Sequence, residues 1–232
     1  DVADLKYHLQ KAIHLAKTGR PGPIWLDLPL DVMSQIIEPN KLRSFDPVEL
    51  LQEETDTDLS SVLSDALEGL MTAKRPILFL GTGVRLAKAE EELIALLDLV
   101  KIPYVCSWNM QDAFDGDDPL YCGSPGTFGT RFANFSVQNA DFLLAIGTRL
   151  SISQTGHNYK SFARKAKKIV VDIDPNELEK GTVVPDIPVC CDAKVFISAL
   201  LNRANNITNF PRKDITPWLD KCSYWKKTIN FN

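Results

Sequence analysis

The chain has 232 residues, of which 44% are hydrophobic and 24% are charged, and its formal net charge is −4. This weak acidity argues against a nucleic-acid partner, which needs a basic surface, and no run of about 18 apolar residues predicts a membrane span. No signal peptide is visible, and the five cysteines include no C-x-x-C pair, so neither a disulfide framework nor a zinc site is indicated. We therefore predict a cytoplasmic protein with reduced, buried thiols.

The first 33 residues are predicted to form one helix and one strand. Apolar residues recur at helical spacing over 2–17, and Gly19 ends that pattern. The run 24–28 is apolar and short, and Pro29 stops it. One helix and one strand are too small to hold a core, so residues 1–33 are interpreted as the last αβ unit of a larger domain, and the chain as a fragment.

Residues 58–205 alternate between helical and strand patterns. The predicted helices are 58–70, 87–99, 130–139, 162–167 and 193–205. The predicted strands are short apolar runs at 76–80, 102–106, 142–146, 168–174 and 189–191. Strands that alternate with helices predict right-handed crossovers, and therefore an α/β fold whose parallel sheet carries helices on both faces.

The segments on either side of this region lack such alternation. Residues 34–57 carry Pro, Asn and acidic side chains without an apolar period, so we interpret them as a connector. Residues 206–232 are interpreted as a linker. Trp218 and Trp225 are seven residues apart, which places them on one face of a helix that we expect to pack on the body of the domain.

Polar residues follow two of the predicted strands. Arg149 comes shortly after the strand 142–146, and Asp172 and Asp174 end the next strand. The carboxyl ends of parallel strands meet at one edge of a sheet, where open α/β folds bind ligands. Arg149 is therefore expected to hold a phosphate or, alternatively, to form a salt bridge. One of Asp172 and Asp174 is expected to accept a ribose hydroxyl while the other caps the turn before Pro175.

Gly81-Thr82-Gly83 lies between a strand and a helix, where backbone N–H groups can approach a phosphate. The alternative is a tight turn without a ligand. A dinucleotide fingerprint is not present, because Leu86 stands at its sixth position and no acid follows the strand 102–106. Asp192 is interpreted most simply as a helix cap.

Several motifs in order resemble thiamine-diphosphate-dependent enzymes of the acetolactate synthase group. The motifs are Gly19-Arg20-Pro21-Gly22-Pro23, Asp27-Leu28-Pro29-Leu30-Asp31, Pro76 to Gly83, Asp118-Pro119-Leu120-Tyr121, Val137 to Asp141, Ile146-Gly147-Thr148-Arg149, Thr155-Gly156, Val171 to Pro175, and Asp192-Ala193-Lys194. The first two resemble the end of the pyrimidine-binding domain, and the others resemble the central domain. The resemblance therefore places the parts as 1–33, 34–57, 58–205 and 206–232.

The resemblance implies a six-stranded, DHS-like NAD/FAD-binding sheet, set between two domains that bind thiamine diphosphate and Mg²⁺. It implies a homo-oligomeric parent that decarboxylates and ligates 2-keto acids, and a central domain that holds FAD, an adenine nucleotide such as ADP, or nothing. The FAD-type contacts carried over by position are Gly81, Thr82, Gly83, Gly147, Arg149, Asp172, Ile173, Asp192 and Ala193. The magnesium motif of these enzymes is absent, so we expect the chain to be catalytically inactive alone.

The chain differs from acetolactate synthases at two places, and two other functions remain as alternatives. Acetolactate synthases usually read Phe-Asp-Asp-Arg where this chain has 150–153, and they often carry His where Phe128 stands. The alternatives are a free-standing redox module that binds FAD or NAD, and an interaction domain without a ligand, because a fold by itself does not determine function.

Overall fold

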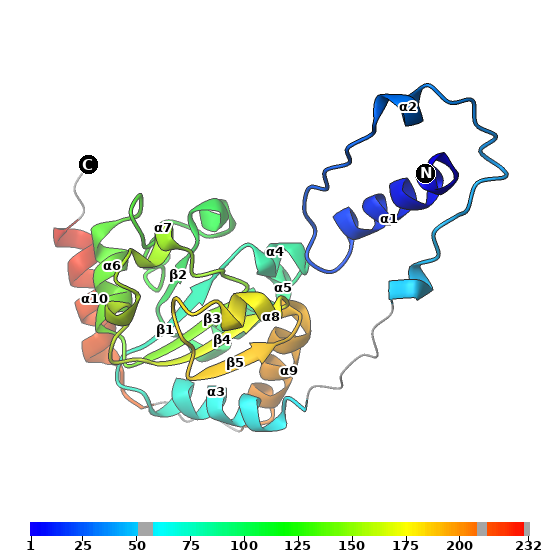
Figure 1. The fold of residues 1–232 in the computed structure, drawn as a ribbon. Coiled ribbons are helices and arrows are strands. Elements are labelled where there is room, and N and C mark those ends of the chain that lie inside the picture. Colours follow the sequence, from blue (N-terminus) through cyan, green and yellow to red (C-terminus); the bar gives the residue numbers. More distant parts are fainter. Residues whose placement is uncertain (51–57, 208–212, 230–232) are drawn as a thin grey trace. The chain divides into compact units, whose positions relative to one another are not determined.

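The computed structural model describes residues 1–50, 58–207 and 213–229, and the chain divides into two compact units, Asp1–Asp56 and Thr57–Asn232 (Figure 1). Parts of the predicted connector and of the predicted linker, at 51–57, 208–212 and 230–232, lie outside the described residues.

A parallel sheet forms the centre of the second unit. Its strands are β1 (Pro76–Leu80), β2 (Tyr104–Cys106), β3 (Phe142–Ile146), β4 (Lys167–Asp172) and β5 (Ile187–Cys190). They pair in the order β2-β1-β3-β4-β5, and every neighbouring pair is parallel. Every residue of β1, β2 and β3 is buried, as expected for strands covered on both faces. The predicted α/β fold with a parallel sheet is confirmed.

The described residues form five strands rather than the six that the resemblance implies. β5 is the last strand on its side of the sheet, and its residues alternate between exposed and buried positions. Pro188 lies within it and has no N–H to donate to a further strand. The same edge position explains why Cys190 is exposed, contrary to the predicted burial of the thiols, whereas Cys106, Cys122 and Cys222 are buried.

Helices cover both faces of the sheet, as predicted. They are α3 (Ser60–Thr72), α4 (Gly83–Leu86), α5 (Glu90–Val100), α6 (Arg131–Asn139), α7 (Ile152–Thr155), α8 (Pro175–Glu179), α9 (Ala193–Asn205) and α10 (Thr216–Thr228). α3 and α5 pack against α9, and α6 packs against α10 on the opposite side (Figure 1). The core between the layers includes the fully buried Phe79, Phe142 and Phe196. Within the described part of the chain, every helix is too short or too polar to cross a membrane.

The helix predicted at 162–167 does not form. The segment makes turns after the short 3-10 helix Tyr159–Ser161, and β4 begins at Lys167. Ala163 adopts a left-handed φ of 43°, which interrupts any helical run. Phe162, Ala163 and Ala166 are buried, so the apolar residues of this segment fill the core from a turn.

The first unit consists of short helices and loops. Its helices are the 3-10 turn Val2–Asp4, α1 (Leu5–Lys17), α2 (Leu30–Met33) and the 3-10 turn Pro47–Leu50. The loop before the last turn wraps α1: the Phe45 N–H donates to Gln10 Oε1 at 2.9 Å, and the Tyr7 hydroxyl donates to Glu49 Oε2 at 2.8 Å.

The strand predicted at 24–28 is absent, because the described residues offer it no neighbouring strand with which to pair. The apolar side chains of this region are therefore uncovered. Trp25 is 90% exposed and Ile36 is fully exposed.

Candidate functional site

The strand order reverses between β1 and β3, and this reversal defines the candidate site. β1 lies between β2 and β3, so the chain leaves β1 toward one side of the sheet and returns to build the other side. Ligands of open α/β sheets bind outside the carboxyl ends of the strands at such a reversal. Gly81-Thr82-Gly83 follows β1 and Gly147-Thr148-Arg149 follows β3, so both predicted turns lie at this point. We call the edge formed by the residues after β1, β3 and β4 the carboxyl rim.

The two glycine turns are in direct backbone contact. Gly81 N donates to Ile146 O at 2.9 Å, and Gly83 N donates to Gly147 O at 2.9 Å. A Cβ on Gly81 would lie 2.2 Å from Gly147 O, and a Cβ on Gly83 would lie 2.6 Å from Gly147 Cα. Gly147 itself has a φ of 59°. Close packing of two turns therefore requires all three glycines, whether or not a ligand is bound.

Within the described part of the chain, two backbone donors at these turns have no acceptor. The N–H groups of Thr82 and Thr148 donate to no described residue, although Thr148 is only 3% exposed. An unpaired buried N–H is unfavourable unless a ligand or water accepts from it. The rim therefore presents the type of donors that hold a phosphate.

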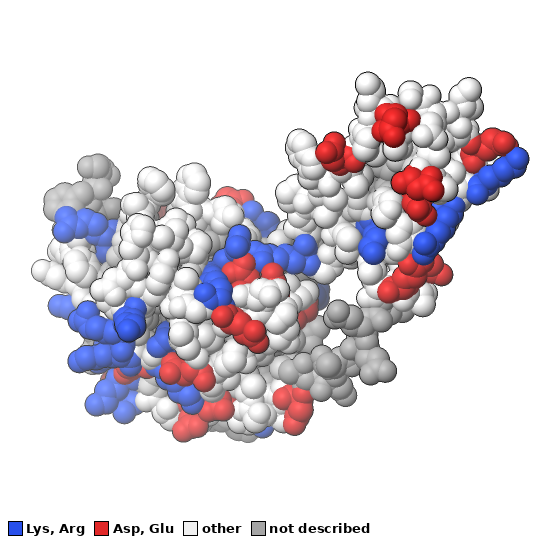
Figure 2. All heavy atoms as spheres, viewed as in Figure 1, with Lys and Arg blue, Asp and Glu red and all other residues white. Residues whose placement is uncertain are grey.

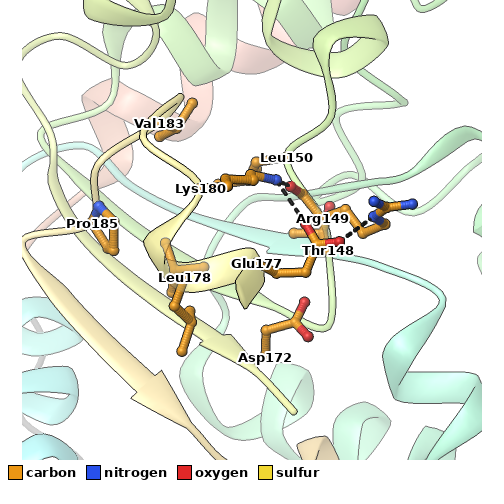
Figure 3. A pocket seen from close by; sticks show the side chains of 10 residues that line it. Thr148, Arg149, Leu150, Asp172, Glu177, Leu178, Lys180, Val183 and Pro185 are labelled. Atoms are coloured by element: carbon orange, nitrogen blue, oxygen red, sulfur yellow. Dashed lines mark hydrogen bonds and ion pairs between the residues drawn. The ribbon is translucent and has the colours of Figure 1, made fainter. Parts of the chain in front are cut away.

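Arg149 is paired within the protein. Its Nε donates to Glu177 Oε1 at 2.6 Å, and Lys180 Nζ lies 3.0 Å from Glu177 Oε2 while also donating to the Arg149 carbonyl. The salt bridge that the sequence left as the alternative therefore forms. Figure 3 shows the guanidinium pointing away from Leu178 and Val183, and its side chain is 64% exposed. Its terminal amino groups have no partner among the described residues, so Arg149 can hold an anion without breaking this pair.

The two aspartates after β4 have separate roles. Asp172 is 7% exposed, and its Oδ1 accepts a hydrogen bond from Asp174 N at 3.0 Å. Asp174 accepts from Asn176 N at 3.0 Å and caps α8, so it is Asp174 that takes the capping role predicted for one of the two aspartates. Between them the Ile173 side chain is 40% exposed. Partial burial and the carboxylates of Asp172 and Asp174 raise the pKa of the Cys190 thiol, so this thiol reports on the charge of the rim.

Asp192 acts as a helix cap, which was the simpler of the two predicted roles. Its Oδ1 accepts from Lys194 N at 2.8 Å and from Val195 N at 3.2 Å, at the start of α9. Ala193 is 7% exposed. The N–H groups of Lys194 and Val195 therefore already donate to a carboxylate, and they are not available to hold a phosphate.

Pairing brings Arg149 and Asp172 to a common edge. Ile146 lies opposite Val171 in the parallel register, and Gly147 N donates to Val171 O at 2.9 Å. A small cavity of about 10 Å³ lies directly beneath them, lined by Thr148, Glu177 and Leu178 among others. This volume is enough for one water molecule, so a nucleotide would occupy the outside of the rim.

A second cavity was missed by the sequence interpretation. It measures about 150 Å³ and is lined by Gly126, Gln138 and Gln154 among others. Gln154 Nε2 donates to Thr148 Oγ1 at 3.2 Å, which connects this cavity with the rim. Gln138 Oε1 is buried without a hydrogen-bond partner among the described residues. Gly126 lets the backbone pass close to α7 at this cavity, since a Cβ on Gly126 would lie 2.3 Å from Ser153 O.

No group of three or more His, Cys, Asp or Glu in the described residues is arranged to hold a metal ion. Asp118 has a structural role: it accepts from the Tyr104 hydroxyl at 2.7 Å and from Leu120 N at 2.8 Å. The chemistry available at the rim is therefore binding through the Arg149 guanidinium, the buried Asp172 carboxylate and backbone N–H donors.

The sequence profile of the family described as "Thiamine pyrophosphate enzyme, central domain" matches residues 63–200, more than half of the chain. The chain belongs to this family. It is 34% identical over 226 residues to a probable acetolactate synthase large subunit of Methanococcus aeolicus, an alignment that covers 94% of this chain and 37% of the relative. It is 36% identical over 217 residues to the probable large subunit of Methanocaldococcus jannaschii, covering 93% and 36%.

The acetolactate synthase large subunit of Haemophilus influenzae is 31% identical over 238 residues, covering 99% of this chain and 40% of the relative. The chain thus contains a thiamine pyrophosphate enzyme central domain homologous to acetolactate synthase large subunits. It spans less than half the length of these relatives.

Proposed function

We propose that the carboxyl rim binds an adenine nucleotide, either ADP or the adenosine diphosphate part of FAD, within an acetolactate synthase-like enzyme that acts on 2-keto acids. The observation that carries this proposal is the convergence of Arg149, Asp172 and two unpaired backbone donors at the reversal of strand order. The residues present fit a nucleotide diphosphate, because they offer a cation and N–H donors for phosphate beside a carboxylate for a ribose hydroxyl.

Each group has a distinct part in this proposal. The Arg149 guanidinium holds a phosphate through its terminal amino groups while Glu177 keeps the side chain in place. Thr82 N and Thr148 N donate to the same phosphates, and the Asp172 carboxylate accepts from the ribose. Gly81, Gly83 and Gly147 hold the two turns together, and the exposed Ile173 packs on the nucleotide's apolar surface. Asp192 and Ala193 contribute by starting α9 beside the rim.

Ser151 bears on the choice between FAD and ADP. Where acetolactate synthases carry an acid, Ser151 caps α7: its side chain accepts from the backbone at Gln154, and Gln154 Oε1 accepts from Ser151 N at 2.9 Å. The capping box replaces the local hydrogen bonds that an acid would make at this position. The turn next to Arg149 is therefore ordered without the acid, which keeps the nucleotide proposal consistent with this departure.

We further propose the wider architecture of the parent enzyme. Residues 1–33 are the end of a pyrimidine-binding domain, residues 34–57 connect it to the central domain at 58–205, and residues 206–232 lead toward a diphosphate-binding domain. The exposed Trp25 and Leu30 support the first assignment, because the rest of a complete domain would cover them. Thiamine diphosphate and Mg²⁺ bind in the flanking domains of a homo-oligomeric, cytoplasmic parent. Thiamine diphosphate supplies the carbon nucleophile for decarboxylation and carboligation.

Titration of the purified chain with ADP, FAD and NAD by isothermal calorimetry tests the nucleotide proposal. We expect ADP or FAD to bind, and Arg149→Gln to weaken binding by at least about tenfold, since a charge-assisted hydrogen bond contributes about 1.5–3 kcal/mol. Arg164→Gln is the matched control, because Arg164 is exposed and lies outside the rim. Bound nucleotide should also slow alkylation of Cys190 by iodoacetamide.

Two results would contradict the proposal. One is that neither ADP nor FAD binds at concentrations up to about 1 mM, because a Kd of 1 mM corresponds to a binding free energy of only about −4 kcal/mol. The other is equal weakening by Arg149→Gln and Arg164→Gln. The first result would favour the alternative of a scaffold domain without a ligand, and tight binding of NAD alone would favour a redox module.

A further inference from the structure

A groove of about 540 Å³ lies at the opposite edge of the sheet from the carboxyl rim. Its walls come from the turn between α3 and β1, which carries Lys74 and Arg75, and from α10 with the residue that leads into it, Lys213. The Trp218 indole Nε1 donates to the carbonyl of Pro76, the first residue of β1, at 2.9 Å. The groove therefore lies beside the amino end of β1, and neither the family match nor the proposed nucleotide site accounts for it.

Two tryptophans make the aromatic wall of this groove. Trp218 is 3% exposed and is fixed by its hydrogen bond to Pro76. Trp225 meets Trp218 edge to face, with ring centroids 5.8 Å apart, and lies 5.8 Å from the ring of Phe135. These contacts hold the Trp225 ring in one orientation while leaving it partly exposed to the groove. The wall is thus a rigid aromatic surface that costs little entropy to present to a ligand.

The groove is surrounded by cations. Lys74, Arg75, Lys213 and Lys221 line it, and Asp214 is its single acidic lining residue. Among the described residues, the amino groups of Lys74, Lys213 and Lys221 form no ion pair with a carboxylate. Lys221 Nζ instead lies 5.4 Å from the centre of the Trp225 ring. Figure 2 shows lysine and arginine side chains gathered over α10, in a chain whose net charge is −4.

Unpaired cations beside an aromatic wall predict the chemistry of a ligand. An anionic group would pair with the lysines, and an apolar ring would stack on Trp225 in place of water. A volume of this size is typical of a site for one small molecule. We propose that this groove binds a small anion that carries an apolar ring, of the aryl phosphate or aryl carboxylate class. The two partners of such a ligand are Lys221 and Trp225, with Lys213 and Lys74 adding positive charge.

Calorimetry on the whole 232-residue chain tests the proposal with 2-naphthyl phosphate as the probe, and with 2-naphthol and inorganic phosphate as its two halves. We expect 2-naphthyl phosphate to bind at least about tenfold more tightly than either half, because the groove contacts both parts. Raising NaCl from about 50 to about 300 mM should weaken the binding, since salt screens exposed charges.

Variants locate the binding. Lys221→Ala and Trp225→Leu should each weaken 2-naphthyl phosphate by at least about fivefold, which is the order expected for one charge-assisted or aromatic contact. Lys227→Ala is the matched control, because Lys227 is exposed on the same helix and does not line the groove. Arg149→Gln should leave this binding unchanged, which separates the groove from the rim. Circular dichroism checks that each variant is folded, and Lys221→Ala tests the proposal even if Trp225→Leu unfolds.

Four outcomes with 2-naphthyl phosphate and its halves would overturn the proposal, and a competing peptide gives a fifth. They are an absence of binding up to about 5 mM, equal binding of 2-naphthol, equal weakening by Lys227→Ala and Lys221→Ala, and loss of binding in Arg149→Gln. If acetyl-tetraglutamate amide bound more tightly than 2-naphthyl phosphate and competed with it, the groove would be a docking surface for an acidic segment of protein, and the small-molecule proposal would be wrong.

Discussion

A glycine-to-alanine change can cost stability in two ways: the new methyl group can clash with neighbouring atoms, or the backbone conformation can be strained for an L-residue. Four glycines of the central domain separate these two costs. A Cβ on Gly81 would lie 2.2 Å from Gly147 O, but Gly81 does not have a positive φ. Gly156 has a φ of 76° and nothing within 4 Å of a built Cβ. Gly147 combines both conditions, with a φ of 59° and Gly83 Cα 2.8 Å from its built Cβ. Gly116 has neither.

The structure assigns a magnitude to each change to alanine. Gly156→Ala should destabilise the domain by about 1–3 kcal/mol, because the φ of 76° and ψ of −179° at this position form a conformation that essentially only glycine adopts. Gly81→Ala should destabilise by about 1–3 kcal/mol, because backbone atoms must move to accept the methyl group. Gly147→Ala should carry both costs, the strain and the clash, and should destabilise the domain by about 2–5 kcal/mol. Gly116→Ala should be neutral or slightly stabilising, since it only reduces the freedom of the unfolded chain.

Urea unfolding monitored by circular dichroism measures these differences in the free energy of unfolding. In thermal unfolding, each 1 kcal/mol of destabilisation should lower the melting temperature by about 2–4 °C for a domain of this size. The expected order of stability is Gly116→Ala, then Gly156→Ala and Gly81→Ala, then Gly147→Ala. If Gly81→Ala were as harmless as Gly116→Ala, the two turns would not be packed against each other, and the geometry assigned to the carboxyl rim would be wrong.

Three further predictions concern the cap of α9, a buried thiol and the activity of the whole chain. Asp192→Ala should destabilise by about 0.5–2 kcal/mol in urea unfolding because α9 loses its cap, and Asp192→Asn should recover most of that loss. Burial raises the pKa of the Cys106 thiol from 9.0 to about 11, against the effect of its hydrogen bond with Tyr121. The unfolded thiol loses its proton at lower pH than the folded one, so the free energy of unfolding should fall as pH rises from 9.0 toward about 11, and Cys106→Ala should lessen that fall. The chain should form no acetolactate from pyruvate with thiamine diphosphate and Mg²⁺, because its sequence has no Gly-Asp-Gly motif; a colorimetric assay that detects turnover would contradict this.

The sheet was predictable from local patterns because its strands are buried on both faces. The runs that became β1 and β3 contain only apolar residues, and their length of five residues with glycine directly after each favours a buried strand over a helix. The helix Ala193–Asn205 forms where the sequence predicts it, because Asp192 marks its start and its apolar period is unbroken. The adjacency of Arg149 and Asp172 followed from the parallel order of the strands.

The wrong predictions share one physical cause, which is context beyond the local sequence. Residues 24–28 have the composition of a strand, but a strand also needs a neighbour, and the described residues supply none. The apolar residues of 162–167 fill the core from a turn, which periodicity cannot distinguish from a short helix. Two further features were not specified by the sequence although no prediction about them was wrong. The partner of Arg149, Glu177, and the cavity beside Gln138 depend on side chains that meet only after folding.

Two-dimensional ¹⁵N–¹H NMR with ADP tests the central claim most directly, because it reports which backbone amides a nucleotide touches. The carboxyl rim predicts shifts at the amides of Thr82, Gly83, Thr148 and Ile173, with the amides of α10 unchanged. Shifts confined to α10, or no shift at the rim with about 5 mM ADP, would contradict it.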